Sequence, residues 1–181
     1  MSIPEKKTIF LCFLIALSLF TNACSLKMPN VAELTLESLK NAEYHTIAQG
    51  TFRLTDGIYN IPPLLNESQE DWFIKLVEPI AFGDLNSDGI NDAVVVLKMR
   101  TGGTGVFVEI AAVLNKNGKP VNVATTLLGD RKIVNSISIQ SSEIIIEGLT
   151  QGPNDGLCCP SLLTTWKFNL VGNELVLPNN P

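Results

Sequence analysis

Residues 105–128 read GVFVEIAAVLNKNGKPVNVATTLL, and the expected fold follows from this segment. Two runs rich in Val, Ile, Ala and Thr lie on either side of Lys116-Asn117-Gly118-Lys119. Asn-Gly readily takes positive φ at both central positions of a tight turn, which is the geometry that joins two antiparallel strands. The segment therefore predicts a β-hairpin formed by Gly105–Leu114 and Val121–Leu128.

Short runs of the same kind, bounded by Gly, Asn, Asp or Pro, continue on both sides of this hairpin. A second turn signal, Gln140-Ser141-Ser142, separates two of them. Strands at such short intervals favour an antiparallel sheet or sandwich over βαβ units. The further predicted strands are Thr51–Leu54, Gly57–Ile61, Trp72–Val77, Ile80–Leu85, Ala93–Met99, Ile133–Ile139, Glu143–Leu149, Leu162–Leu170 and Glu174–Leu177.

One segment near the N-terminus has a helical pattern. Between Val31 and Tyr44, apolar residues recur at the spacing of one helix face, with acidic residues between them. The sequence thus predicts a mainly β protein, an antiparallel sheet or sandwich with one short N-terminal helix. The alternative is an α+β fold.

The first 23 residues have the pattern of an export signal. Lys6 and Lys7 precede the nearly continuous apolar run Thr8–Phe20, and a small residue, Ala23, follows. A basic start, an apolar run of about 7–15 residues and a small residue before the cleavage site are typical of a secretory signal peptide. The run is shorter than the roughly 20 residues that a membrane-spanning helix needs.

Cys24 indicates a lipid anchor. Bacterial lipoprotein signals end in a small residue directly before a cysteine that receives the lipid, and Ala23-Cys24 resembles that site. Thr21 stands where such sites usually have Leu, and the alternative is ordinary cleavage after Ala23. The prediction is a signal peptide over 1–23, a lipid-anchor tether over 24–30 and a single β-rich domain over 31–181. The acyl anchor would hold this domain at a membrane of the bacterial envelope without spanning it.

The composition bears on partners. The chain carries 13 basic and 18 acidic residues, a formal net charge of −5, with the basic residues scattered. A protein that binds nucleic acid would show a basic patch or stripe, so nucleic acid is not an expected partner. Apolar residues make up 45% of the chain, which is enough for a packed core and excludes disorder of the whole chain.

One motif carries specific chemistry. Residues 84–92 read DLNSDGIND, with acidic or amide side chains at relative positions 1, 3, 5 and 9 and a glycine at position 6. Calcium takes about six to eight oxygen ligands, and this spacing brings alternate oxygens to the inside of a sharp turn. The alternative is a solvated turn without an ion. The predicted ligands of a structural Ca²⁺ are Asp84, Asn86, Asp88, the carbonyl of Ile90, and Asp92.

The Asp84–Asp92 segment resembles known calcium-binding loops. An EF-hand needs Glu at position 12, where this chain has Val95. The closer resemblance is to the Asp-x-Asp-x-Asp-Gly-x-x-Asp loops of integrin-type propeller blades, in which position 9, here Asp92, completes the ligand set. Those blades occur in series, whereas this chain has one copy. The resemblance implies a structural ion on a loop between two strands.

A wider pattern covers most of the chain after the signal. Its segments are Leu39–Tyr44, Leu54–Gly57, Phe82–Gly89, Thr101–Gly105, Ala112–Asn115, Gly118–Thr125, Leu128–Arg131, Gly152–Asp155 and Cys158-Cys159-Pro160. In these segments the chain is similar to a group of uncharacterised bacterial secreted proteins and lipoproteins, to which no activity is assigned. The resemblance implies an exported single domain and no particular reaction.

Two adjacent cysteines, Cys158 and Cys159, lie in a segment rich in Gly and Pro. Three states are open to them: a vicinal disulfide, two thiols, or metal ligands. A zinc site needs four ligands, and two cysteines without a neighbouring histidine make a poor one. The prediction is a tight turn over Gly152–Pro160, with or without the disulfide.

The sequence has no recognisable catalytic arrangement. His45 is the only histidine, and no Gly-x-Ser-x-Gly elbow exposes a serine. Trp72, Trp166 and Tyr59 are candidates for a sugar-stacking face, although isolated aromatics in strands more often belong to the core. The expected function is a non-catalytic envelope module that binds an envelope protein or a glycan, or that stabilises a partner. The alternative is a small hydrolase of cell-wall or extracellular polymers that uses carboxylates of Asp84–Asp92.

Overall fold

The computed structural model describes residues 31–62 and 72–178, which belong to one compact unit. In these ranges the chain forms eleven strands, all paired antiparallel, and one short helix, which confirms the mainly β prediction. No helix in the same ranges has the length and apolarity of a membrane span. The predicted signal peptide, the tether and Cys24 lie outside the described residues.

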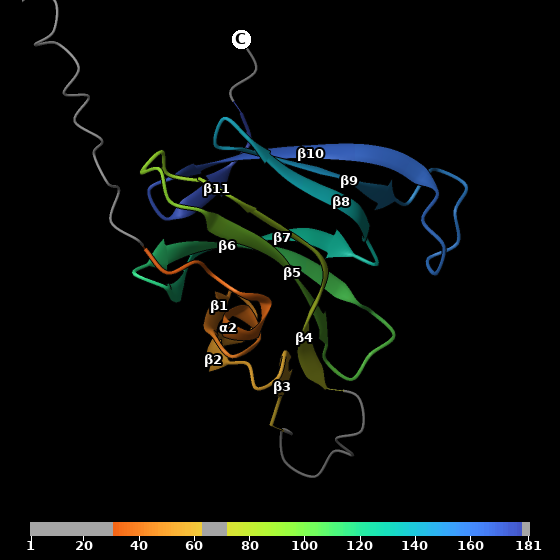
Figure 1. Ribbon diagram of the computed structural model, residues 1–181. Helices are drawn as coiled ribbons and strands as arrows, with labels where there is room; N and C mark the ends of the chain where they lie inside the picture. The colour runs from red at the N-terminus through yellow and green to blue at the C-terminus, as the bar shows by residue number, and fades with distance from the viewer. Residues whose placement is uncertain (1–30, 63–71, 179–181) are drawn as a thin grey trace, which may run out of the picture. The chain divides into compact units, whose positions relative to one another are not determined.

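The strands form two sheets and a separate hairpin (Figure 1). The five-stranded sheet has the order β3-β4-β5-β6-β7, the four-stranded sheet has the order β11-β10-β9-β8, and β1 pairs with β2. The elements are α2 (Leu36–Lys40), β1 (Glu43–Thr46), β2 (Gly50–Arg53), β3 (Ile58–Asn60), β4 (Phe73–Gly83), β5 (Asp92–Arg100), β6 (Phe107–Lys116), β7 (Lys119–Asp130), β8 (Ile133–Gln140), β9 (Glu143–Thr150), β10 (Leu162–Val171) and β11 (Glu174–Val176).

The hairpin predicted from residues 105–128 is present as β6 and β7. Lys116 pairs with Lys119 at its end, and the two turn residues, Asn117 and Gly118, have φ values of 57° and 82°. Positive φ at both positions matches the right-handed twist of the two strands. The β8–β9 turn is built in the same way, with Ser141 and Ser142 at positive φ.

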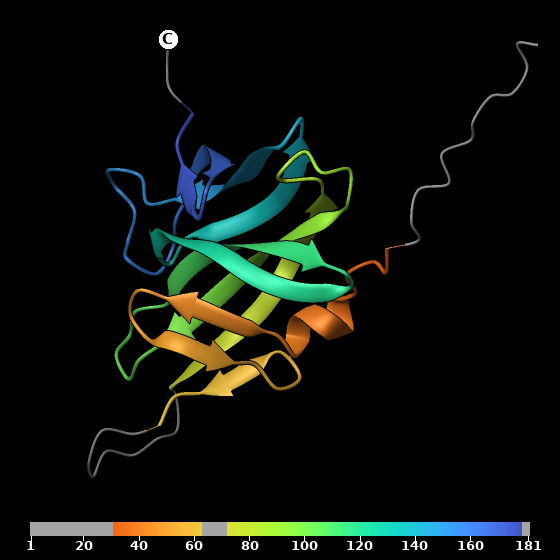
Figure 2. The same ribbon diagram turned by 90° about the vertical axis from the view of Figure 1, so that its left-hand side faces the viewer.

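The five-stranded sheet is the middle of three layers (Figures 1 and 2). One of its faces packs against the four-stranded sheet through a core that includes Val94 and Val96. Its other face is covered by α2 and the β1–β2 hairpin, through a second core that includes Leu39, Tyr44 and Val95. Nearly all side chains of β5 and β6 are therefore buried, which is why both strands are continuous apolar runs.

The N-terminal helix is shorter than predicted. It spans α2 alone, and the end of the predicted segment Val31–Tyr44 belongs to β1. The Thr35 hydroxyl accepts a hydrogen bond from the Ser38 N–H (3.1 Å), and the Ser38 hydroxyl accepts one from the Thr35 N–H (3.0 Å), so a capping box fixes the start of the helix. After the helix, Tyr44 and Thr46 are buried at alternate positions, a period that belongs to a strand.

The predicted strands Trp72–Val77 and Ile80–Leu85 form one strand, β4. Its register against β5 shifts between Val77 and Ala81. Pro79 lies in this interval and has no N–H for the ladder, so the irregularity is expected there. Beyond it the strand runs on to Gly83 and leads directly into the predicted calcium loop.

Candidate functional site

The predicted calcium loop, Asp84–Asp92, connects β4 to β5; we call it the acidic loop. Gly83 at the end of β4 pairs with Asp92 at the start of β5, so the loop closes a hairpin. Ser87 and Gly89 have φ values of 61° and 80°, which gives the sharp turn that the spacing requires. The structure therefore places four of the predicted ligands in the turn and the fifth, Asp92, at the first position of β5.

The carboxylates of Asp84 and Asp88 organise the inside of the acidic loop. Asp84 Oδ1 accepts hydrogen bonds from the N–H groups of Asn86 and Asp88 (both 3.2 Å), and its Oδ2 accepts one from the N–H of Gly89 (2.8 Å). Asp88 accepts one from the N–H of Ile90 (2.9 Å) and one from Nδ2 of Asn86 (2.9 Å). Bonds from Asp and Asn side chains to the following backbone are what give such turns their shape.

Asp92 lies at the base of the acidic loop and is 0% exposed. It accepts hydrogen bonds from the N–H of Leu85 (3.0 Å) and the N–H of Asn115 (2.8 Å), which tie the loop to β6. Burial raises the pKa of Asp92, its two backbone bonds lower it, and the nearby charges of Asp88 and Asp84 raise it; the net direction is upward. A cation in the loop would oppose this effect, because it favours the charged carboxylate.

The β8–β9 turn packs over the acidic loop. The Ser142 hydroxyl donates to the carbonyl of Asp84 (3.0 Å), and its oxygen lies 3.1 Å from the hydroxyl oxygen of Ser87. Together with Ile139 and Ser141, these residues line a cavity of about 400 Å³. The acidic loop is therefore a point of contact between the two sheets, with a polar cavity beside it.

The donor set of the acidic loop suits Ca²⁺ in its chemistry, because all five predicted ligands supply oxygen. The carboxylate oxygens already accept N–H groups, so Asp84 and Asp88 would have to share them between the backbone and an ion. In residues 31–62 and 72–178, no three Asp, Glu, His or Cys side chains form a group that could hold a metal ion. Asp92 is instead bonded to the backbone of Leu85 and Asn115.

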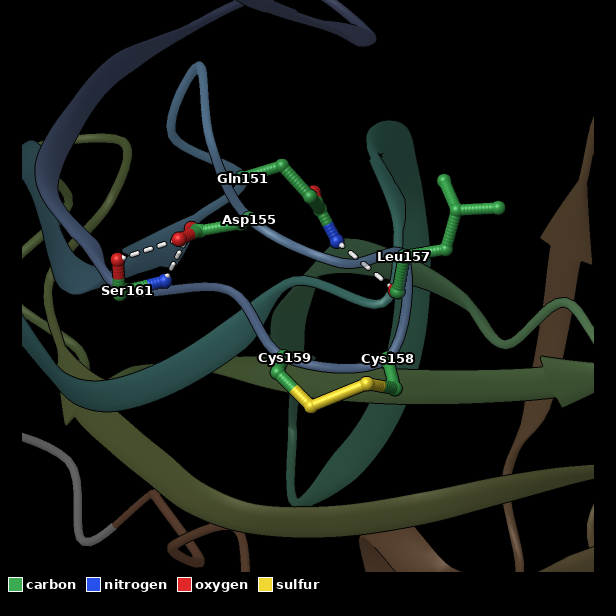
Figure 3. Close-up of a disulfide and its surroundings, with 6 residues drawn as sticks. All are labelled: Gln151, Asp155, Leu157, Cys158, Cys159 and Ser161. Atoms are coloured by element: carbon green, nitrogen blue, oxygen red, sulfur yellow. Dashed lines mark hydrogen bonds between the residues drawn. A yellow bond between two sulfur atoms is a disulfide. The ribbon is translucent and has the colours of Figure 1, made fainter.

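Cys158 and Cys159 form a disulfide in the loop between β9 and β10, which we call the disulfide loop (Gln151–Ser161; Figure 3). Asp155 holds this loop together. Its carboxylate accepts hydrogen bonds from the N–H of Gly152 (2.7 Å) and from the N–H and hydroxyl of Ser161 (both 2.8 Å). These bonds lower the pKa of Asp155. The predicted turn over Gly152–Pro160 is thus built around a carboxylate.

The candidates for catalysis and sugar stacking are dispersed. His45 is exposed on β1, and its Nδ1 lies 3.0 Å from the hydroxyl oxygen of Thr51 on β2. Trp72 and Tyr59 pack against the core beneath α2, whereas Trp166 packs against the core between the sheets. The three aromatic residues therefore do not share one sugar-binding face.

Two buried polar residues, Glu109 and Asn115, are additions to the predicted set. The Asn115 side chain donates to the carbonyl of Ala32 (2.9 Å) and accepts from the N–H of Gly118 (2.7 Å), which links the β6–β7 turn to the N-terminal segment. Glu109 is 4% exposed, and its Oε2 has no partner among the described residues. Burial raises its pKa from 4.5 to about 6. The sequence signal that could have identified Glu109 is a single acidic residue within an otherwise apolar predicted strand.

The features that bear on function are therefore the acidic loop, the cavity beside it and the disulfide loop. Each of them is built from residues of this chain that the structure describes. Comparison of the chain with protein-family models, with curated proteins and with solved structures finds no match in any of the three.

Proposed function

We propose that this chain is an exported bacterial lipoprotein, anchored through Cys24, whose β-rich domain is a non-catalytic binding or structural module. In this proposal Ca²⁺ binds the acidic loop and stabilises it. The observation that carries the calcium part is the geometry of the acidic loop. The carboxylates of Asp84 and Asp88 turn toward the inside of a sharp turn, where they accept hydrogen bonds from the N–H groups of Gly89 and Ile90.

A structural role of the ion follows from the position of the acidic loop. The loop joins β4 to β5, and the Ser142 hydroxyl donates to the Asp84 carbonyl from the β8–β9 turn. An ion that orders the loop would therefore also support the contact between the two sheets. Three carboxylates within nine residues repel one another at neutral pH, and a divalent cation offsets that repulsion.

The cavity beside the acidic loop supports a glycan as the ligand. The polar residues that line it are Asp84, Ser87, Ser141 and Ser142, and Ile139 is the apolar one. Carboxylates and hydroxyls are hydrogen-bond partners for the hydroxyl groups of a sugar. Partners of this kind suit a hydroxylated ligand better than an apolar one.

An envelope protein is the second candidate partner, and a different surface favours it. Leu157 and Leu163, at the disulfide loop and the start of β10, are 74% and 78% exposed. Exposed large apolar side chains often mark a protein contact where they form one contiguous patch. The two partners would therefore use separate parts of the molecule.

The hydrolase alternative has less support. A general acid or base must come within hydrogen-bond reach of the substrate, and Asp92 has no exposed surface. The carboxylates of Asp84 and Asp88 are engaged by the N–H groups of their own loop. These carboxylates are therefore better suited to shaping the loop than to proton transfer.

The lipid anchor is tested by growing bacteria that express the full chain with an alkyne-tagged fatty acid. We expect the wild-type protein to be labelled, the Cys24→Ala variant to be unlabelled, and the matched variant Cys12→Ala to be labelled like wild type. Wild-type protein that is exported without label would show ordinary cleavage after Ala23 and overturn the anchor.

The calcium site is tested by thermal melting of the exported protein in chelator and across a calcium titration. Free Ca²⁺ at 100 times the dissociation constant adds about 2.7 kcal/mol if only the folded state binds it. For a domain of this size, that corresponds to a rise of about 5–10 °C in the midpoint. Asp88→Ala should abolish the rise, and the exposed control Glu174→Ala should keep it. Equal midpoints with chelator and with calcium would refute calcium binding.

A further inference from the structure

We propose that the Cys158–Cys159 disulfide is a reversible thiol–disulfide exchange site, which an external dithiol reduces while the domain stays folded. The proposal rests on three properties of the disulfide loop: the two cysteines are adjacent, both are exposed, and the loop is held by other bonds. It depends neither on calcium in the acidic loop nor on the anchor at Cys24.

The first property argues against a role in global stability. A disulfide stabilises a fold mainly by closing a loop of the unfolded chain, and its effect grows with the number of residues in that loop. Cys158 and Cys159 are neighbours in the sequence, so their bond joins no distant parts of the chain. The strands on either side, β9 and β10, are already paired from Thr150↔Leu162 to Glu143↔Asn169.

The second property is access. Both cysteines are exposed, and the neighbouring Leu157 is 74% exposed. Exposed disulfides are the ones that exchange with external thiols, whereas buried structural disulfides resist reduction.

The third property is that other bonds hold the loop. Asp155 accepts hydrogen bonds from Ser161 (Figure 3) and from the Gly152 N–H, and the Cys159 N–H donates to the carbonyl of Gly156 (3.1 Å). The Gln151 side chain donates to the carbonyl of Leu157 (3.5 Å). None of these contacts uses a sulfur atom. Breaking the S–S bond therefore leaves the bonds that shape the loop in place.

The exchange is balanced in atoms and electrons. A thiolate of the dithiol attacks one Sγ, the S–S bond breaks, and a mixed disulfide forms while the other Sγ leaves as a thiolate and takes up a proton. The second thiol of the reductant, as its thiolate, then attacks the reductant's first sulfur atom; the mixed S–S bond breaks, and the second protein Sγ leaves as a thiolate and takes up a proton. The dithiol leaves as a cyclic disulfide, and two electrons and two protons have passed to Cys158 and Cys159.

The test uses the full chain in detergent with dithiothreitol as the reductant, and oxidised glutathione in a parallel solution serves as an exposed reference disulfide. Samples are alkylated at intervals, and peptide mass mapping follows the peptide with Cys158 and Cys159 separately from those with Cys12 and Cys24. We expect the protein disulfide to be reduced at a rate within about tenfold of the reference. Oxidised glutathione, added after the dithiothreitol is removed, should restore it.

The fold is followed in parallel. The melting midpoints of the reduced protein and of the double variant Cys158→Ser/Cys159→Ser should lie within about 4 °C of the oxidised protein. A larger fall in either sample would make the disulfide structural and overturn the proposal. Reduction that requires urea, or that is more than about a hundredfold slower than that of the reference, would overturn it equally.

Discussion

Glu109 allows a quantitative prediction, because the fold buries its carboxylate without a partner for Oε2 in the described residues. Because side chains alternate along a strand, Glu109 lies on the same face of β6 as Phe107 and Ala111. It pairs with Leu97 of β5 on one side and with Leu127 of β7 on the other. Burial raises the Glu109 pKa from 4.5 to about 6. The ionised form at neutral pH is therefore a source of instability.

The magnitude follows from the pKa. One pKa unit corresponds to about 1.4 kcal/mol, and screening by solvent beside the half-exposed Leu127 lowers the effect. The ionised Glu109 should thus destabilise the fold by roughly 1–2 kcal/mol at neutral pH. Because the folded-state pKa lies above the unfolded value, the folded state binds more protons between about pH 4.5 and 6. The contribution of Glu109 to stability falls as the pH rises through that window and stays low above it.

The perturbation is Glu109→Gln, which removes the charge and keeps the shape. The amide still lacks a partner, so we expect a gain of about 1 kcal/mol at neutral pH, or about 2–4 °C in the melting midpoint. Circular dichroism melts at about pH 4.5 and about pH 7 measure both the gain and its pH dependence.

The matched control for this prediction is Glu174→Gln, the same substitution at an exposed position of β11. It should change neither the melting midpoint at neutral pH nor the pH dependence of the midpoint. In Glu109→Gln the loss of stability between the two pH values should be smaller than in wild type. An unchanged pH dependence, or a lower midpoint at neutral pH, would refute the reasoning.

Two further substitutions test other parts of the fold. Asp92→Asn leaves either the Leu85 or the Asn115 N–H without its buried acceptor. Urea unfolding should show that the free energy of unfolding falls by about 1–3 kcal/mol. A variant as stable as the wild type would contradict the role of this carboxylate. Gly102 has a φ of +80°, and Gly102→Ala would put a Cβ against the ring of Trp72. We therefore expect the free energy of unfolding to fall by at least about 1 kcal/mol and the tryptophan fluorescence to change. An unchanged fluorescence spectrum and melting midpoint would contradict this packing.

The strand pattern was predictable where local signals and packing agree. Asn117-Gly118 specifies a turn that only an antiparallel pair can use, and the apolar run before it, β6, is buried on both faces. The helix over Val31–Tyr44 was overestimated because its apolar spacing also suits a strand. Tyr44 is placed by its pairing with Phe52 of β2, a contact that local periodicity does not encode.

The acidic loop shows the same division between local and distant information. Its turn follows from the spacing of Asp, Asn and Gly, and the structure has that turn. The buried Asp92 accepts a hydrogen bond from the N–H of Asn115, which lies 23 residues away on β6. The cavity depends on the β8–β9 turn, which is more than 50 residues from the loop. The spacing of the residues predicted the oxygen ligands of the loop, but it could not show which of these ligands face the sheet.

The most direct test of the calcium proposal is a calcium titration of the ¹⁵N-labelled protein, followed by the amide signals of Gly89 and Ile90. These two N–H groups donate to Asp84 and Asp88, so an ion that shares the carboxylates must move their resonances. We predict saturable shifts at both signals in wild type and none in Asp88→Ala. Signals that stay in place in wild type up to millimolar calcium would reduce the acidic loop to a turn without an ion and contradict the calcium-stabilised module.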